Sequence, residues 1–401
     1  MIHLTVAALS AATGVGATVL TQHVMASGGG AAGTPAAAAA EQDEAMDDQA
    51  VYKQVEPGIV DVTANLQYLQ ETAKGTGFVI DAGAGLVLTN NHVIDQATSV
   101  TVTLVTSGKS YPARILGYDA AGDVALLQVR GAALTAVRTG DSSLVDVGMP
   151  VLAIGNEAGQ GGSPTVAPGV ISSLGRTIVA SDQSSGLTET LHGMFQTSAD
   201  IRPGDSGGPL ADASGRVIGI DTAAGGSTVY SGYAIPVSQA LPIARQIAAG
   251  RPGGHVQLGL PAFLGVLLPD SASSGSRRQD SQQVRPTGAV TSHGAVTSGI
   301  TETSGSTCSG TSDVPAVPAH VAPVRSGALV DGVLCGTPAD QAGIVTGDVI
   351  TAVAGEPVSS TGSLTSLLRR YHPGSVVQLD WTGPDGRQHI GVVTLAAGPA
   401  G

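Results

Sequence analysis

The segment Gly204-Asp205-Ser206-Gly207-Gly208-Pro209-Leu210 predicts a loop that presents a nucleophilic serine. A serine hydroxyl is a weak nucleophile, so it needs a neighbouring base and donors that stabilise the oxyanion formed when it attacks. The glycines allow a sharp bend, which lets the N–H groups of Gly204 and Ser206 converge on one point. Gly204, Asp205 and Ser206 therefore form the predicted oxyanion hole. A plain Gly/Ser turn is the alternative for an isolated string of this kind.

A base and a carboxylate lie upstream in suitable settings. His92 follows the apolar strand expected at residues 85–88, and Asp123 directly precedes the strand expected at residues 124–127. A carboxylate so placed can fix the tautomer of an imidazole and stabilise the imidazolium. Asp119 is the rival acid, and we assign it a turn-forming role because Asp suits loops. The chain order His, Asp, Ser is that of the chymotrypsin barrels rather than that of subtilisin or the α/β-hydrolases.

Several further segments strengthen this reading, and together with the three above they resemble the HtrA/DegP family of proteases over roughly residues 51–250. They are Lys74-Gly75-Thr76-Gly77-Phe78-Val79-Ile80, Ala153-Ile154-Gly155-Asn156, Pro168-Gly169-Val170-Ile171-Ser172, Gln196-Thr197 and Gly232-Tyr233-Ala234-Ile235-Pro236. The resemblance implies two packed antiparallel β-barrels with a catalytic triad in the cleft between them. It assigns His92 as general base, Asp123 as the residue that orients it and Ser206 as nucleophile.

The chain also departs from the family pattern. The family usually has Asn where Asp205 stands, and we expect Asp205 to act as an acceptor that stabilises its loop. The loop at residues 156–163 lacks the family's Pro-Phe, so loop regulation is not carried over. Family members are commonly trimers through an N-terminal aromatic cluster. Only Tyr52 and Tyr68 lie near that region here, which leaves a homo-oligomer open.

Asp200 is a candidate for the specificity pocket because it lies six positions before Ser206. Chymotrypsin-like enzymes place the base of the S1 pocket there, and an acid could receive a basic P1 side chain through a charge-assisted bond. The alternative is that Asp200 pairs with nearby Arg202 and that a small aliphatic P1 residue is preferred, as in most of the family.

The sequence changes character after residue 250 and resembles a PDZ domain over residues 258–398, interrupted by a Ser/Gly/Thr/Pro-rich insert at about 269–325. Short helices are expected at residues 339–344 and 364–371, and two final strands at 376–381 and 389–395. The resemblance makes Phe263-Leu264-Gly265-Val266 the loop that binds a peptide's terminal carboxylate, which implies peptide C-termini as partners. Core packing of Phe263 and Leu264 is the alternative, and both roles are compatible.

The N-terminal part predicts export. Residues 1–26 are largely apolar and are interpreted as a signal peptide or membrane anchor, and 27–50 as an Ala/Gly-rich and acidic linker. An exported chain permits a disulfide, so the only two cysteines, Cys308 and Cys335, are expected to pair. The protein is therefore predicted to be extracytoplasmic, either secreted or anchored to the membrane.

Composition narrows the remaining classes. The 57 glycines and the aromatic share of 3% favour a turn-rich, mostly β protein, and the net charge of −13 argues against nucleic-acid binding. No Cys/His spacing predicts a metal site, and no cofactor is expected. The fold class is thus mostly β, a chymotrypsin-like double β-barrel followed by a smaller α+β PDZ domain. The resemblance implies a serine endopeptidase acting on unfolded or exposed polypeptides. The alternative is a peptide-binding chaperone or scaffold with a latent protease fold.

Overall fold

The computed structural model describes residues 46–156, 159, 161–181, 188–222, 232–269 and 321–400. Its helices are α1 (Asp48–Val55), η1 (Glu56–Gly58), α2 (Asn91–Ile94), η2 (Ser142–Leu144), α3 (Val237–Ala248), α4 (Pro338–Gln341) and α5 (Thr361–Leu368). The strands of the first barrel are β1 (Ile59–Leu66), β2 (Glu71–Asp81), β3 (Leu86–Thr89), β4 (Ser99–Leu104), β5 (Ser110–Asp119) and β6 (Val124–Val129). Those of the second are β7 (Arg138–Thr139), β8 (Pro150–Gly155), β9 (Thr165–Ser181), β10 (Thr188–Thr197), β11 (Pro209–Asp212), β12 (Arg216–Thr222) and β13 (Gly232–Pro236). The remaining strands are β14 (Val256–Leu258), β15 (Ala262–Phe263), β16 (Val266–Leu267), β17 (Ala328–Leu329), β18 (Gly332–Val333), β19 (Val349–Val353), β20 (Glu356–Pro357), β21 (Val376–Thr382), β22 (Gln388–Thr394) and β23 (Ala396–Ala397).

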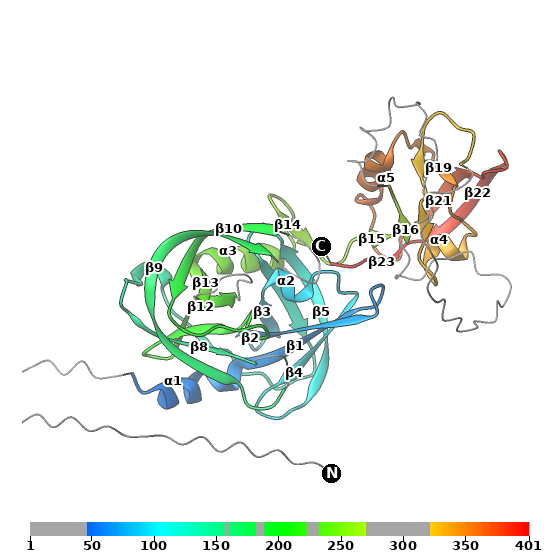
Figure 1. Cartoon of the computed structure of the whole chain (residues 1–401). Helices are drawn as coiled ribbons and strands as arrows, with labels where there is room; N and C mark the ends of the chain where they lie inside the picture. Colours follow the sequence, from blue (N-terminus) through cyan, green and yellow to red (C-terminus); the bar gives the residue numbers. More distant parts are fainter. Residues whose placement is uncertain are drawn as a thin grey trace, which may run out of the picture. The chain divides into compact units, whose positions relative to one another are not determined.

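Strands β1 to β6 form a closed antiparallel barrel, drawn in blue to cyan in Figure 1. The strand order is β5-β4-β1-β2-β3-β6, and pairing of β5 with β6 closes the ring. Alternate residues of a strand point to opposite faces of a sheet, so every second residue of β1 enters the barrel. Val60, Val62 and Ala64 accordingly lie in its buried core.

Strands β8 to β13 form a second closed barrel, drawn in green. Its order is β11-β8-β9-β10-β13-β12, and pairing of β11 with β12 closes it. The segment expected to close this barrel is β13, which pairs with both β10 and β12. Its interior holds Val151, Phe195 and Leu210.

A separate apolar core joins the two barrels. Phe78 and Leu88 contribute to it from the first barrel, and Leu152 and Ile220 from the second, while α1 and α3 pack against it. Phe78 is fully buried, and burial of such a side chain stabilises the fold by about 2–3 kcal/mol. The two barrels therefore share one hydrophobic interface.

The C-terminal module is smaller and contains both helices and strands. Its main sheet has the order β17-β19-β21-β22, and α5 packs against β17 and β19. Ser360 caps α5 in a reciprocal capping box with Ser363, which starts the helix three residues before the expected position. The expected helix at 339–344 is the shorter α4, and the two final strands are β21 and β22.

Several predictions fall outside the described residues. The proposed signal or anchor at 1–26, most of the linker at 27–50, nearly all of the insert and Cys308 belong to that group. Cys335 is disulfide-bonded, and its pairing with Cys308 stays a prediction. Within the described residues, no helix combines the length and the apolar character needed to cross a membrane.

Candidate active site

His92 lies on the short helix α2, directly after strand β3 of the first barrel. Its ring Nδ1 lies 2.8 Å from Oδ2 and 3.0 Å from Oδ1 of Asp123. Its backbone N–H also donates to Asp123 Oδ1 at 2.9 Å. The imidazole is 29% exposed whereas the carboxylate is 1% exposed. A buried carboxylate on Nδ1 leaves Nε2 as the basic atom on the accessible side of the ring.

Asp123 is held in a conformation that few residues adopt. Its φ is 50°, in the left-handed region that costs a residue other than glycine about 1–3 kcal/mol. Its carbonyl oxygen accepts a hydrogen bond from Asn90 Nδ2 at 2.9 Å, which ties it to the residue that precedes α2. Asp119 accepts from the N–H of Gly122 at 3.0 Å, which is the turn-forming role expected for it. The tight turn between β5 and β6 thus aims Asp123, rather than Asp119, at His92.

The loop around Ser206 depends on its glycines. Gly204 has φ 101° and Gly207 has φ 86°, both in the region that favours glycine. A Cβ on Gly207 would lie 2.1 Å from the carbonyl oxygen of Thr76 and 2.2 Å from Oγ1 of Thr89. The N–H of Asp205 donates to the carbonyl of Arg202 at 2.9 Å. Of the three predicted oxyanion-hole residues, Asp205 therefore uses its backbone N–H in a hydrogen bond within the loop.

Thr76 on β2 fastens this loop to the first barrel. Its N–H donates to the carbonyl of Ser206 and its Oγ1 to the carbonyl of Gly204, both at 2.8 Å. Asn156, at the end of β8, donates from its backbone to Thr76 Oγ1 at 3.0 Å. Next to Thr76, a Cβ on Gly75 would lie 2.7 Å from Val93, the neighbour of His92, and 3.0 Å from the carbonyl of Ser206. The structure thereby brings the α2 segment and the Ser206 loop to the same place on β2.

Sequence reasoning assigned no role to Thr76 or Asn156. The available signal was a polar residue inside an apolar strand run, since a buried hydroxyl or amide needs partners. Asn156 Nδ2 also donates to Asp61 Oδ1 at 2.8 Å. Burial raises the pKa of Asp61, while the bond from Asn156 and the charge of Lys74 act in the opposite direction.

Asp205 acts as the loop-stabilising acceptor that the sequence suggested. Its Oδ2 accepts the N–H of Arg202 at 2.9 Å, and its Oδ1 lies 3.3 Å from Oγ1 of Thr165. A Cβ on Gly155 would lie 2.6 Å from Asp205 Oδ1. The side chain is 5% exposed and therefore packs into the end of β8.

Asp200 forms a bidentate contact with Arg202. The guanidinium donates from Nε at 2.9 Å and from Nη2 at 2.6 Å, and both bonds reach the same oxygen, Oδ2. The other oxygen, Oδ1, is buried and has no hydrogen-bond partner. This geometry agrees with the alternative in which Asp200 pairs with Arg202. The S1 role of Asp200 stays a prediction.

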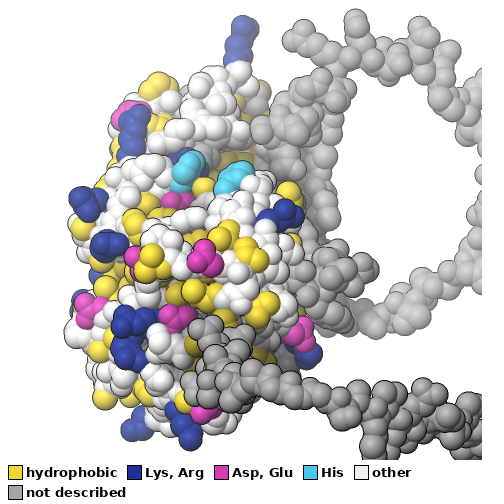
Figure 2. Space-filling view, turned by 90° about the vertical axis from the view of Figure 1, so that its left-hand side faces the viewer, with side chains coloured by type: hydrophobic (Ala, Val, Ile, Leu, Met, Phe, Trp, Pro, Cys, Tyr) yellow, Lys and Arg dark blue, Asp and Glu magenta, His cyan; other side chains and the backbone are white. Residues whose placement is uncertain are grey.

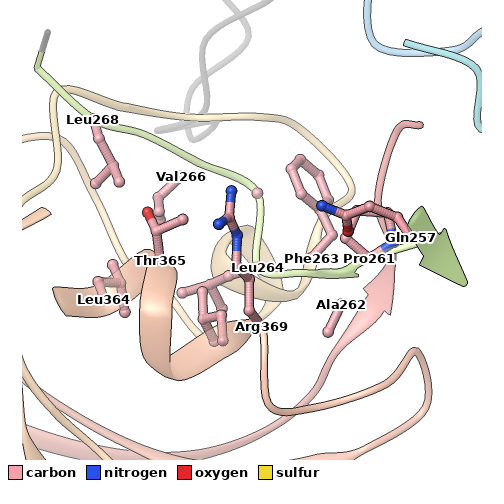
Figure 3. Close-up of a pocket in the computed structure, with 12 residues that line it drawn as sticks. Gln257, Pro261, Ala262, Phe263, Leu264, Val266, Leu268, Leu364, Thr365 and Arg369 are labelled. Carbon is pink, nitrogen blue, oxygen red and sulfur yellow. The ribbon is translucent and has the colours of Figure 1, made fainter. Parts of the chain in front are cut away.

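The PDZ-like module carries a groove between the 262–268 segment and α5 (Figure 3). Leu264, Val266 and Leu368 make it largely apolar, and Arg369 adds a cation at the end of α5. Leu264 is 1% exposed and belongs to the module's core while also lining the groove, so its two suggested roles coincide. Gly265 has φ 87°, and a Cβ there would lie 2.2 Å from Thr337.

The carbonyls of this loop are tied to the module itself. Leu264 O accepts from Ala339 N at 2.8 Å, and Gly265 O accepts from Leu334 N at 2.9 Å. Figure 3 shows the Arg369 side chain extending from α5 toward the turn that follows Leu264.

Among all the described residues, no group of three or more His, Cys, Asp or Glu side chains could hold a metal ion.

Comparisons with known proteins agree with this architecture. A trypsin-like peptidase domain model matches residues 75–220, and a PDZ domain model matches residues 329–382. The chain is 33% identical over 323 residues to the putative serine protease HhoA of Synechocystis sp. This aligned region covers 80% of this chain and 70% of HhoA. It is 33% identical over 310 residues to the periplasmic pH-dependent serine endoprotease DegQ of Escherichia coli, covering 76% of this chain and 55% of DegQ.

This chain therefore spans about half the length of DegQ. Among solved structures, the HtrA-type protease AlgW with a tripeptide is 26% identical at a TM-score of 0.44, with coverage of 88% of this chain and 97% of that chain.

Proposed function

Because the chain belongs to the HtrA/DegP family of trypsin-like serine proteases, we propose that it is an extracytoplasmic endopeptidase that cleaves unfolded or exposed polypeptides. The observation that carries the proposal is the contact between His92 and the buried carboxylate of Asp123 at 2.8 Å, next to a glycine-shaped serine loop. The periplasmic relatives support the location outside the cytoplasm.

The proposed mechanism proceeds through an acyl-enzyme. His92 Nε2 takes the proton of Ser206 as the hydroxyl attacks the scissile carbonyl, and Asp123 stabilises the resulting imidazolium. The developing oxyanion is bound by the N–H groups of Gly204 and Ser206. His92 then protonates the leaving amine, and an activated water hydrolyses the ester by the reverse sequence. The hydrogen bonds from Thr76 to the carbonyls of Gly204 and Ser206 support this assignment, because they fix the peptide units that directly follow the two donor amides.

The PDZ-like groove is proposed to bind peptide C-termini by strand addition beside β16. The bonds that Leu264 O and Gly265 O accept from Ala339 and Leu334 hold this turn in place, and its backbone N–H groups are the proposed donors to a terminal carboxylate. Arg369 places a positive charge in the same groove, and the apolar lining suits a hydrophobic last side chain. The physiological ligands would therefore be proteins with an exposed, apolar C-terminal residue.

A fluorophosphonate probe tests the peptidase proposal, because it reacts only with a serine activated by a base and an oxyanion hole. We expect the native chain to be labelled and to digest casein, and Ser206→Ala to lose both. Ser359→Ala, a change at an exposed serine ahead of α5, is the matched control and should behave as the native chain. If the native chain is neither labelled nor active, even with a C-terminal peptide present, the chain is instead a binding protein with a protease fold.

A further inference from the structure

Asp221 is an unusual residue within strand β12. It follows the apolar run Val217-Ile218-Gly219-Ile220 and is fully buried, with 0% of its surface exposed. Neither of its carboxyl oxygens forms a hydrogen bond of normal geometry, and the Ile154 amide is the one donor that acts on the carboxylate within the described residues. A buried ionised carboxylate without partners is strongly disfavoured, so such a group normally keeps its proton. The proposed mechanism assigns no role to this residue.

The backbone of Asp221 holds the nucleophile loop. Its carbonyl accepts the N–H of Gly207 at 2.8 Å, and its own N–H donates to the carbonyl of Gly208 at 2.8 Å. These two glycines follow Ser206 directly. On the other side, Asp221 pairs with Ala234 of β13. A shift at Asp221 is therefore passed to the residues that set the position of Ser206.

The charged group that faces Asp221 in the described part of the chain is Asp205, the residue before the nucleophile. The other elements packed around it present uncharged residues, namely Ala234 on β13, Gly208 in the loop and Ile154 on β8. Burial and then the negative charge of Asp205 raise the pKa of Asp221 well above its usual range, and the Ile154 amide opposes this. Asp205 is itself anchored by the N–H of Arg202.

We propose that Asp221 is a positioning residue for the nucleophile loop and that it acts as the protonated member of a buried acid pair with Asp205. While Asp221 holds its proton, the pair carries one negative charge, which the Arg202 amide helps to stabilise. When the proton passes to water, two carboxylates oppose each other beneath Gly207 and Gly208. The loop must then move to separate or hydrate them, which displaces Ser206 from His92.

The consequence is an upper pH limit on activity that the triad does not impose. Protonation of the general base sets the acid limb of the profile, since only neutral imidazole accepts the serine proton. Ionisation of Asp221 would add an alkaline limb. Asn cannot ionise and keeps the shape of Asp, so Asp221→Asn should remove that limb while leaving the acid limb in place.

The test compares the pH dependence of the second-order rate of fluorophosphonate labelling in the native full-length chain and in Asp221→Asn. We expect the labelling rate of the variant to stay on its plateau for at least about one pH unit above the alkaline midpoint of the native chain, over which the native rate falls about tenfold. Asp146→Asn, at an exposed carboxyl of the same barrel, is the control and should reproduce the native profile. Identical alkaline limbs in the native chain and Asp221→Asn would overturn the inference.

A second arm does not depend on activity and uses Ser206→Ala chains in urea unfolding at several pH values. A carboxyl whose pKa is raised on folding binds more protons in the folded state, so its contribution to stability is lost as pH rises from the unfolded pKa through the folded one. Asp221→Asn should therefore gain stability relative to its parent as pH rises. Asp205→Asn removes the repelling charge, so its total loss of stability as pH rises should be smaller than that of the parent.

If the stability of the parent and of both variants depends on pH in the same way, the proposed acid pair is refuted. The kinetic arm rests on the proposed function, whereas the unfolding arm does not. Absence of labelling in every chain would therefore refute the peptidase proposal, and the unfolding arm would still decide on Asp221.

Discussion

At the scale of single residues, the site depends on a residue whose backbone conformation is costly on its own, Asp123. Asp123 has a positive φ, and the hydrogen bond from Asn90 together with those to His92 stabilises it there. Such strain persists where surrounding contacts over-determine it, and it is common at functional sites. The carboxylate is thereby held on Nδ1 before any substrate arrives.

Asp123→Asn tests the orienting role. The amide can hold His92 only in the wrong tautomer, so kcat should fall by about 10³- to 10⁴-fold, as in other triads. Steady-state hydrolysis of a peptide substrate measures the change. Asp119→Asn is the matched control, because it alters the neighbouring turn without touching His92. A comparable loss of kcat in both variants would show that the turn, and not the carboxylate, is what matters.

Arg202→Ala tests what Asp200 does. In the native chain Arg202 neutralises Asp200, so we expect Val or Ala at P1 to be cleaved better than Arg. Removing Arg202 leaves Asp200 able to receive a basic side chain, and kcat/KM for P1 Arg should rise about tenfold relative to P1 Val. A library of peptides varied at P1 gives the ratio. An unchanged ratio would place Asp200 away from the P1 side chain.

At the scale of elements, the groove along α5 follows from where that helix begins and ends. The Ser360 capping box starts it, and it ends at Leu368, directly before Arg369. Apolar residues at helical spacing indicated this helix, but the sequence reading placed it at 364–371. The first turn, residues 361–363, is polar and no more than half-buried, so apolar spacing does not mark it and the capping box at Ser360 is its sequence signal.

Arg369→Ala should weaken binding of a peptide with a free C-terminus by about tenfold, because a charge-assisted bond is lost. The same peptide with a C-terminal amide should bind the native chain and the variant equally weakly. Fluorescence anisotropy of labelled peptides measures both affinities. Arg370→Ala is the control, since Arg370 pairs with Glu356. A similar loss in both variants would mean a general effect on α5.

At the scale of the whole molecule, charge is the dominant long-range feature. The chain has 31 acidic and 18 basic side chains, and Figure 2 shows both kinds interspersed on one face rather than gathered into separate patches. The net charge of −13 then acts as a diffuse field that attracts cationic polypeptides, which salt screens over about 10 Å at 0.1 M.

We therefore expect kcat/KM for a cationic peptide substrate to fall several-fold between low and high salt. An acidic peptide with the same residues around the scissile bond should show the opposite trend, because its repulsion is screened instead. Initial rates over a salt series at one pH provide the measurement. Parallel trends for the two peptides would indicate a salt effect on the enzyme itself.

The sequence by itself determined the parts of this protein that depend on local chemistry. The positions of His92, Asp123 and Ser206 at strand ends and in a glycine loop, the two barrels and the PDZ-like module were all predictable. The three site positions rest on short motifs at strand ends and in a glycine-rich loop, and the two barrels and the PDZ-like module on the family resemblance that such motifs carry. The role of Asp119 as a turn former was predictable for the same reason, since its bond reaches only three residues along the chain.

Only the tertiary structure decided which distant groups meet. Thr76 lies 128 positions before Gly204, and Asp221 lies on strand β12 whereas Asp205 lies in the loop before β11, so no pattern along the chain relates them. The contact between Asp200 and Arg202 likewise became known only with the side-chain geometry. Burial, charge and pKa arise from everything that packs around a group, and barrel closure brings those neighbours together from across the sequence.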